Sequence, residues 1–506
     1  MVLALSLLLA SYEPVIQFSV DATARTPISP YIYGNNFPDW KTQAGLFTFV
    51  RMGGNRLTAY NWETNASNAG NDYQHQNDGY MGESNEPGWS VRQFVAPAQA
   101  NGAVALVTVP TAGYVSADKN GGGDVNKTPN YLATRFHVSL PKKPGPLSLN
   151  PDTTDRVVYQ DEFVNWVERT RKPSLPVWYS LDNEPDLWGS THQRIWAKNP
   201  TYAQIVANNI AFATGIKRVA PKALVFGPAN YGWQGFRTFQ NAPDGNGRDF
   251  LDFYLAEMRQ AEKKAGRRLV DVLDIHWYPE AKGGGKRIAF EVGDAATAAA
   301  RIQAPRSLWD PTYVEDSWIE DTLGNKPIML LPRVQKQIAA NYPGTKFAIT
   351  EYNYGAGKEV SGLLAQADVL GIFGRERLFA ANAFIIAPTD IAHMAAFRAY
   401  RNFDGKGAKF GDLGLRATGG KPEATSLYAA VDSKNPGRLT LVAINKTKAP
   451  LRIQVNVRGF LARSGTGFTF AEGKFNSAAK SSPKVAKGVL AATLPSESVT
   501  TFELKK

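Results

Sequence analysis

The segment from Val177 to Trp188, which reads VWYSLDNEPDLW, decides the fold of this chain. It starts as an apolar strand and ends in acidic and amide side chains, which a proline then stops. In a parallel barrel, polar residues at the carboxyl end of a strand stand at the mouth, where active sites lie. Glu184 is therefore a candidate general acid, because a partly apolar setting favours its neutral form. Asn183 beside it is a candidate for hydrogen-bonding a substrate hydroxyl.

The tripeptide Asn-Glu-Pro does not carry this prediction by itself. It occurs again at residues 85–87, where it follows MGES and no strand precedes it. A single polar cluster after a strand is explained equally well as a cap on that strand. A functional interpretation therefore needs a second cluster.

A second cluster follows another apolar strand. Residues 346–355 read KFAITEYNYG and place Glu351 at the end of that strand. Glycoside hydrolysis requires two carboxyl groups, one that protonates the leaving oxygen and one that attacks the anomeric carbon or activates water. A separation of about 5 Å predicts retention of configuration, and about 7–9 Å predicts inversion. The sequence does not give this distance.

Apolar, β-branched runs alternate with helical patterns over most of the chain, which is typical of an α/β fold with a parallel sheet. Eight strands are expected, at Ile32–Asn36, Phe47–Arg56, Ala103–Pro110, Pro176–Leu181, Ala223–Pro228, Val270–Tyr278, Lys346–Glu351 and Ala383–Ala387. Helices are expected at 159–171, after Thr201, and at 361–379. Eight such units predict a (β/α)8 TIM-type barrel over residues 28–414, with Glu184 after strand four and Glu351 in strand seven.

The pattern changes after about Gly414. Short strands with turn residues between them are expected at 438–445, 451–457, 467–470 and 498–504. The segment 15–20 is also strand-like. We therefore predict a small antiparallel β-sandwich built from residues 12–27 and 415–506.

The composition of the chain argues against several classes of function. The 506 residues carry 57 basic and 45 acidic side chains, a net charge of +12. Lys and Arg are scattered, with a Lys-rich tail from Lys474, so we expect no nucleic-acid partner. The absence of cysteine excludes disulfides and thiol catalysis. No stretch is long enough to span a membrane, and we expect a monomer.

The apolar residues 2–10 bear on whether the protein is secreted. They resemble the end of the apolar part of a signal peptide, although the usual basic start is missing. A cloning remnant or a trimmed precursor would explain that start equally well. We expect an extracellular, secreted protein whose signal is incomplete or trimmed.

Several stretches together resemble glycoside hydrolase family 44. They are residues 179–188 and 350–355 around the two glutamates, together with 51–55, 60–63, 274–279 and 400–407. The matches occur in order over residues 31–412. The resemblance implies a retaining endo-β-1,4-glucanase of cellulase type, acting on glucans, xyloglucan and sometimes xylan, on a barrel with an appended sandwich.

The resemblance also implies roles for individual residues. Glu184 would be the acid/base and Glu351 the nucleophile. Tyr278 would donate a hydrogen bond to Glu351, and Arg51 would steady the same carboxylate. No cofactor is needed for this chemistry, while a structural calcium ion is compatible with the family; the sequence does not assign its ligands.

Aromatic residues near the strand ends are further candidates for substrate binding, because rings stack on sugar faces. They are Trp62, Trp188, Trp277 and Tyr352, although each single Trp is also explained as a core or loop anchor. Related barrels carry an aromatic platform at the end of strand eight, whereas residues 384–388 here read FIIAP. His276 lies within strand six, and the five histidines offer no metal-binding set.

Three alternatives stay open from the sequence. The first is another barrel glycosidase, such as a xylanase or an arabinofuranosidase. The second is a carbohydrate-binding protein without activity, against which the intact pair of glutamates argues. The third, a nucleic-acid-binding protein, would need a cluster of basic residues.

Overall fold

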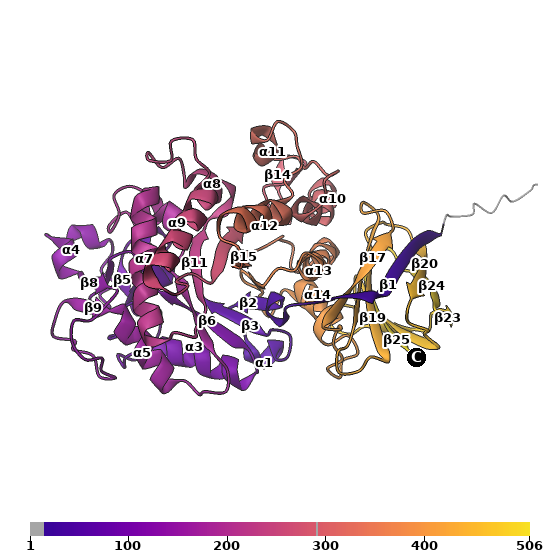
Figure 1. Ribbon diagram of the computed structural model, residues 1–506, viewed down its shortest axis with the longest axis horizontal. Coiled ribbons are helices and arrows are strands. Elements are labelled where there is room, and N and C mark those ends of the chain that lie inside the picture. The colour runs from indigo at the N-terminus through magenta and orange to yellow at the C-terminus, as the bar shows by residue number, and fades with distance from the viewer. Residues whose placement is uncertain (1–14, 290–291) are drawn as a thin grey trace, which may run out of the picture. The chain divides into compact units, whose positions relative to one another are not determined.

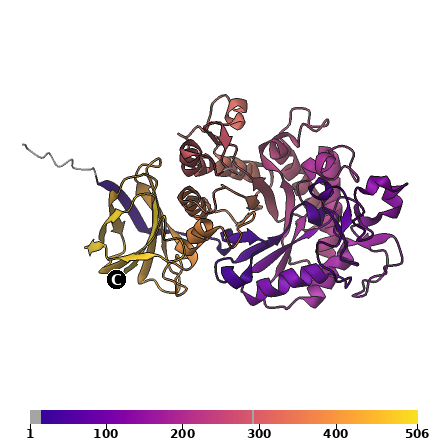
Figure 2. The same ribbon diagram turned by 180° about the vertical axis from the view of Figure 1, so that it is seen from behind.

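The computed structural model describes residues 15–289 and 292–506, and Figures 1 and 2 show it from opposite sides. The chain divides into two compact units. The barrel unit consists of residues 29–357 and 372–390, and the sandwich unit of residues up to 28 together with 358–371 and 391–506. The signal-like run 2–10 and the predicted sandwich residues 12–14 lie outside the described residues.

Eight parallel strands close the predicted barrel. In chain order they are β2 (Gly34–Asn36), β3 (Phe49–Met52), β6 (Val104–Val109), β10 (Val177–Leu181), β11 (Val225–Asn230), β12 (Val272–Trp277), β15 (Lys346–Tyr352) and β16 (Ala380–Ala383). Each pairs with its neighbours in parallel register, and β16 returns to β2. The predicted TIM-type barrel is therefore confirmed, with Glu184 just after the fourth strand and Glu351 in the seventh.

The inside of the barrel changes character along the strands. Near their amino ends, apolar side chains such as Phe49, Trp178 and Phe226 form one cluster, with ring centroids 5.6–5.9 Å apart. Nearer the carboxyl ends, buried polar side chains such as Arg51 and His276 replace them. This packing closes the lower part of the barrel and leaves charged groups at the mouth.

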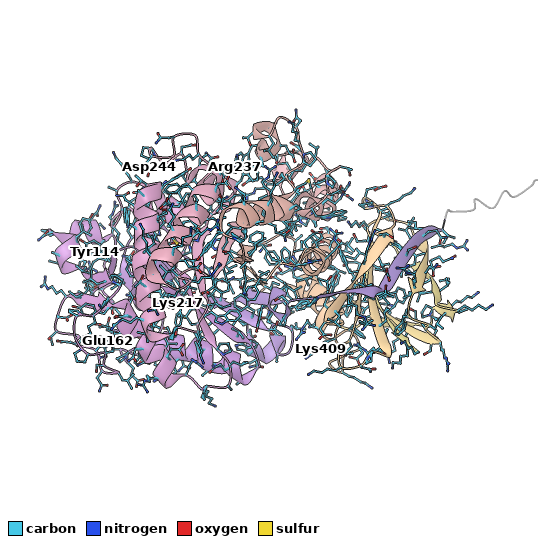
Figure 3. The ribbon with its side chains drawn as sticks, viewed as in Figure 1. Tyr114, Glu162, Lys217, Arg237, Asp244 and Lys409 are labelled. Atoms are coloured by element: carbon cyan, nitrogen blue, oxygen red, sulfur yellow. The ribbon has the colours of Figure 1, made fainter. Side chains whose placement is uncertain are left out.

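Helices surround the strands (Figure 1). The longer ones are α3 (Trp89–Ala100), α5 (Gln160–Thr170), α7 (Tyr202–Val219), α9 (Phe250–Ala265) and α12 (Leu330–Asn341), whereas most of α13 (Val360–Arg375) belongs to the sandwich unit. Helix α7 begins with a capping box between Thr201 and Gln204, as the N-cap prediction requires. Near its end, buried Lys217 (labelled in Figure 3) bonds Asp271, 2.7 Å away. This ion pair ties the helix to the residue that precedes β12.

The position of strand eight is corrected. Residues 383–387 were expected to form it, but β16 covers Ala380–Ala383 and pairs with β15 and β2. Its sequence, AANA, lacks the β-branched and aromatic residues that identify strands, whereas the following FIIA carries them. Pairing with two neighbouring strands outweighs the local propensity.

The sandwich unit contains one ten-stranded sheet. The strands are β1 (Ile16–Pro27), β17 (Leu413–Gly419), β18 (Thr425–Val431), β19 (Arg438–Asn445), β20 (Leu451–Arg458), β21 (Ser464–Phe470), β22 (Ala479–Ser481), β23 (Lys484–Ala486), β24 (Val489–Leu494) and β25 (Ser498–Lys505). Their order is β22-β21-β25-β19-β18-β17-β1-β20-β24-β23, antiparallel except between β1 and β20. They enclose one apolar core. As predicted, the opening segment joins this C-terminal sheet, through β1.

Within the sandwich unit, two helical segments cover one outer face of this sheet. Tyr428 on β18 donates a hydrogen bond of 2.6 Å to Asp368 on α13, and Thr501 on β25 bonds the carbonyl of Ala399 on α14 (Ile391–Arg401). The predicted boundary at 414 had placed these helices with the barrel. In residues 15–289 and 292–506, no helix has the length and apolar character needed to cross a membrane.

Candidate active site

The turn after β10 has an unusual backbone. Asp182 and Glu184 both have left-handed conformations, with φ of 66° and 43°, which non-glycine residues adopt at a cost. Asp182 is fully buried and accepts hydrogen bonds from the Thr58 hydroxyl and from the backbone amides of Thr111 and Ala112. These contacts hold the turn in place, and so they fix the position of Glu184.

Glu351 on β15 has a charged and a neutral hydrogen-bond donor. Arg51 on β3 donates from Nη1 to Oε1 at 2.5 Å, and the Tyr278 hydroxyl donates to Oε2 at 2.8 Å. The carboxylate is 4% exposed and Arg51 is fully buried. Both contacts predicted for this glutamate are therefore present, and each stabilises a negative charge on it.

Arg51 also connects the two glutamate-bearing strands. Its Nη2 donates to Oδ1 of Asn183 at 2.8 Å, and the amide of Gly54 donates to the same oxygen at 3.3 Å. A Cβ atom on Gly53 would lie 2.1 Å from Nη1 of Arg51. Gly53 thus leaves room for the guanidinium group.

His276 on β12 lies between the two glutamates. Its Nδ1 is 2.8 Å from Oε1 of Glu184 and 3.5 Å from Oε2 of Glu351. One carboxylate oxygen of each glutamate and a ring nitrogen of this histidine all lie within 4.8 Å of one another. The sequence interpretation had considered His276 only as a metal ligand, so its place between the carboxyl groups was missed. The segment 274–279 contained the signal, but its meaning depends on distances across three strands.

The two glutamates are both buried but differ in their partners. No cation among the described residues contacts Glu184, and burial raises its pKa to about 8, with Arg51 lowering it and Asp72 raising it by smaller amounts. Burial also lowers the pKa of His276 to about 3, so its ring is neutral at ordinary pH. A neutral ring does not stabilise a carboxylate as a cation would. Glu184 is therefore suited to hold a proton, and Glu351 to carry a charge.

The same three groups form the one cluster of His, Asp or Glu in the described parts of the chain that has ligand atoms close enough to hold a metal ion. The buried Arg51 guanidinium already neutralises Glu351. A cation placed here would be repelled by it. The donor set thus fits proton transfer and nucleophilic attack better than metal binding.

The structure corrects four of the aromatic candidates. Trp62 and Trp188 are fully buried, the first stacked on Phe163 and the second packed on Trp196. Trp277 and Tyr352 are 1% and 0% exposed. They directly follow His276 and Glu351 in their strands, so alternation turns them away from the barrel interior. None of the four presents a ring face to a sugar.

Phe384 is the aromatic residue at the end of strand eight. It follows the last residue of β16 directly and is half-buried. A Cβ atom on Gly54 would lie 3.8 Å from its ring, and its backbone amide donates to the carbonyl of Tyr352 at 3.0 Å. The ring therefore lies close to the loop that contacts Asn183. The misplaced strand boundary had hidden it.

Sequence comparison finds a matching family model and two related proteins. The model of glycoside hydrolase family 44 matches residues 66–281. Endoglucanase A of Paenibacillus lautus is 42% identical over 458 residues, which are 85% of this chain and 64% of that protein. The β-mannanase/endoglucanase A of Caldicellulosiruptor saccharolyticus is 40% identical over 88% of this chain and 35% of its own. The chain thus spans less than two thirds of the length of these two relatives.

A solved structure matches nearly the whole length of this chain and all of its own. It is a Paenibacillus polymyxa xyloglucanase from glycoside hydrolase family 44, solved with xyloglucan. It has a TM-score of 0.92 and is 37% identical, with 97% of this chain and 100% of that chain covered. The similarity therefore includes the barrel, both glutamate-bearing strands and the C-terminal sheet.

Proposed function

The chain belongs to glycoside hydrolase family 44, and we propose that it cleaves internal β-1,4 bonds of cellulose-type glucans and xyloglucan with retention of configuration. The observation that carries this proposal is the approach of the Glu184 and Glu351 carboxyl groups to within 4.8 Å. Retaining enzymes hold the two groups about 5 Å apart, while inverting enzymes leave room for a water molecule between them. The relatives named as endoglucanases and a xyloglucanase support the choice of substrate.

The first chemical step forms a glycosyl-enzyme. An oxygen of Glu351 attacks the anomeric carbon, while the bond from that carbon to the leaving sugar's oxygen breaks. Glu184 transfers its proton to the leaving oxygen, so the sugar departs as a neutral alcohol. In the second step a water molecule attacks the same carbon, Glu184 takes its proton, and Glu351 is released as a carboxylate.

Two contacts support this division of roles. Arg51 and Tyr278 bond different oxygens of Glu351, so the carboxylate is oriented as well as stabilised. Within residues 15–289 and 292–506, no cation contacts Glu184, and burial raises its pKa to about 8. A protonated carboxyl group at neutral pH is what the first step requires.

The stereochemistry of the first product tests the mechanism. With cellopentaose as substrate, proton NMR should show the β-anomer of the new reducing end before mutarotation produces the α-anomer. Initial formation of the α-anomer would exclude retention. Glu351→Gln should abolish the reaction, because an amide does not form the glycosyl-enzyme.

The mode of cleavage is tested on polymers. Carboxymethyl cellulose, xyloglucan and xylan should be compared by viscosity and by reducing ends. An endo-acting enzyme lowers viscosity sharply while few reducing ends appear. Release of arabinose or of single terminal sugars instead would favour another barrel glycosidase, and binding without release would favour an inactive sugar-binding protein.

No cofactor takes part in these steps. A structural calcium ion, which the family resemblance allows, is a further part of the proposal. Its ligands are not assigned, because outside the catalytic centre no group of three acidic or histidine side chains in residues 15–289 and 292–506 brings its ligand atoms within 4.8 Å of one another.

Melting temperature tests the calcium proposal. The melting temperature should fall when the metal is removed with EGTA and recover when Ca²⁺ is added. An unchanged melting temperature under both treatments would exclude a structural calcium ion.

We also propose that the protein is secreted and acts as a monomer. A polymeric substrate supports secretion, because such a polymer does not enter a cell intact. Expression of the gene in its own host, followed by assay of medium and cells, tests secretion, and light scattering of the purified protein tests the monomer. Activity confined to the cells would exclude secretion.

A further inference from the structure

The positive charge of this protein is concentrated in one part of the chain. Residues 413–506 contain 15 Lys and Arg against 5 Asp and Glu, a net charge of +10 out of +12 for the whole chain. The other 412 residues are therefore close to neutral. The 42 Lys and Arg of residues 1–412 are nearly balanced by 40 Asp and Glu, so the excess of positive charge belongs to the C-terminal segment.

One face of this sheet is open. Within the sandwich unit, α14 packs against β21 and β25, and α13 is hydrogen-bonded to β18. On β17, β1, β20 and β23, by contrast, alternate residues are exposed while their neighbours enter the apolar core. The exposed set is Arg416, Thr418, Gln17, Ser19, Arg452, Asn456, Arg458 and Lys484, together with Ala491 and Thr493 of β24, which lies between β20 and β23, and Ala486 of β23. Every member except the two alanines is polar or positively charged.

Strand register arranges these side chains in rows. Asp21 pairs with Arg416 on one side and with Arg458 on the other. Ser19 pairs with Thr418 and Asn456 in the next row of the same face. Paired residues project to the same side of a sheet, and neighbouring strands lie about 4.8 Å apart. Each row therefore presents its groups side by side across three strands.

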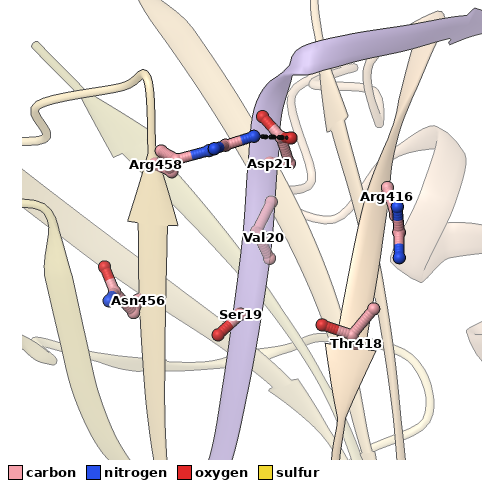
Figure 4. A pocket seen from close by; sticks show the side chains of 7 residues that line it. All are labelled: Ser19, Val20, Asp21, Arg416, Thr418, Asn456 and Arg458. Atoms are coloured by element: carbon pink, nitrogen blue, oxygen red, sulfur yellow. Dashed lines mark hydrogen bonds and ion pairs between the residues drawn. The ribbon is translucent and has the colours of Figure 1, made fainter.

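Figure 4 shows that these two rows line one shallow hollow. Asp21 is the one acidic residue among its lining side chains, and it forms an ion pair with Arg458. No acidic partner is recorded for Arg416 among the described residues. Within the hollow, Arg458 is therefore paired with the carboxylate of Asp21, whereas the guanidinium group of Arg416 is exposed beside this pair.

We propose that this open face of β17, β1, β20 and β23 binds a polysaccharide that carries uronic-acid carboxylates. Arg416, Arg458 and Lys484 would pair with the carboxylates. Ser19, Thr418 and Asn456 would exchange hydrogen bonds with the sugar hydroxyls. The face would hold the enzyme on a mixed, acidic cell-wall material while the barrel cleaves its neutral β-glucan. The choice of a polysaccharide as partner rests on the proposed function.

The composition of the face favours a polysaccharide over a nucleic acid. Single-stranded nucleic acids are bound by cations together with aromatic rings on which bases stack. The exposed set on this face contains no aromatic residue. Short hydroxyl and amide side chains stand between the cations instead. These groups match sugar hydroxyls and offer no surface for a base.

Two variants with the same change in charge test the proposal. In the face variant, Arg416, Arg458 and Lys484 are replaced by Gln. In the control variant, Lys222, Lys263 and Lys264, which are exposed in the barrel unit, are replaced by Gln. Binding of the full chain to immobilised polygalacturonate is measured over a series of salt concentrations. We expect the parent to bind with an affinity that falls with salt, the face variant to bind about 10-fold more weakly, and the control variant to bind as the parent does.

Three results would overturn the proposal. They are absence of binding to polygalacturonate, equal weakening in both variants, and tighter binding of the parent to duplex DNA or polyphosphate than to polygalacturonate. Hydrolysis of neutral xyloglucan is measured beside binding and should be the same in all three proteins. Failure of the parent to cleave xyloglucan would contradict the proposed function but leave the binding result to be judged separately.

Discussion

Two regions of the molecule contain the same tripeptide, Asn-Glu-Pro, in opposite settings. At residues 183–185 it follows β10 at the mouth of the barrel, and Glu184 is 9% exposed beside His276. At residues 85–87 it lies in a loop before α3. There 64% of the Glu86 side chain is exposed, and its carboxylate pairs with Arg92. The chemistry of the side chains is identical, so the difference in behaviour must come from the surroundings.

The comparison shows how a position at the mouth of the barrel changes the pKa and the backbone conformation of a glutamate. Burial removes water from Glu184 and raises its pKa to about 8, whereas the Glu86 carboxylate remains in solvent next to the exposed guanidinium group of Arg92. The left-handed backbone at Asp182 and Glu184 is held by buried hydrogen bonds from neighbouring loops. The reactivity of Glu184 therefore comes from its position in the fold. The following variants test the difference between Glu184 and Glu86, in order of decreasing effect.

Glu184→Gln should have the largest effect. The amide has the size of the carboxyl group but neither gives nor takes a proton, so kcat on xyloglucan should fall about 10³-fold or more. The parent's rate should decline as pH rises through about 8, because the protonated form of Glu184 is the active one. The variant should lose this decline. A variant that kept the parent's basic limb would show that another group is the acid.

Asn183→Ala should have the next largest effect. Asn183 accepts hydrogen bonds from Arg51 and Gly54 and donates one to Asn55, and we predict that it also binds a substrate hydroxyl. Bonds to the sugar hydroxyl next to the reacting carbon strengthen in the transition state, so kcat/KM should fall about 10²-fold. Asn85→Ala is the matched control and should keep the parent's kcat/KM. Equal rates for the two variants would contradict the proposed role.

His276→Ala should have a smaller effect, with a distinct signature in the pH profile. Removing the ring opens space for water beside Glu184 and reduces the burial that raises its pKa. The basic limb should therefore move to lower pH, and kcat at neutral pH should fall about 10-fold. His276→Gln, which keeps a hydrogen-bonding group, should shift the limb less. An unchanged limb in both variants would mean that His276 does not position Glu184.

The sequence was sufficient for the features that depend on strands and their order. Residues such as Glu184 and Glu351 follow clear apolar runs, and parallel strands bring their carboxyl ends to one edge. The contacts of Arg51 and Tyr278 with Glu351 could be expected from the family resemblance. Strand eight was misplaced because AANA carries no strand signal without its neighbours.

Other features could not be read from the chain alone. The inward direction of His276 and the outward direction of Trp277 depend on alternation within β12, and a one-residue error reverses both. The burial of Trp62 depends on Phe163, a residue about 100 positions away. The open cationic face depends on β1 lying between β17 and β20. Such contacts join distant parts of the sequence, so local patterns do not contain them.

Glu86→Gln should have the smallest effect. Its side chain lies 64% exposed and its ion pair with Arg92 is screened by water, so the variant's free energy of unfolding should change by less than about 0.5 kcal/mol. The kcat on xyloglucan and both limbs of the pH profile should match the parent's. Denaturant unfolding and the pH series used for Glu184→Gln would measure both. A loss of activity in Glu86→Gln would mean that the loop before α3 takes part in catalysis, and the contrast between the two tripeptides would no longer hold.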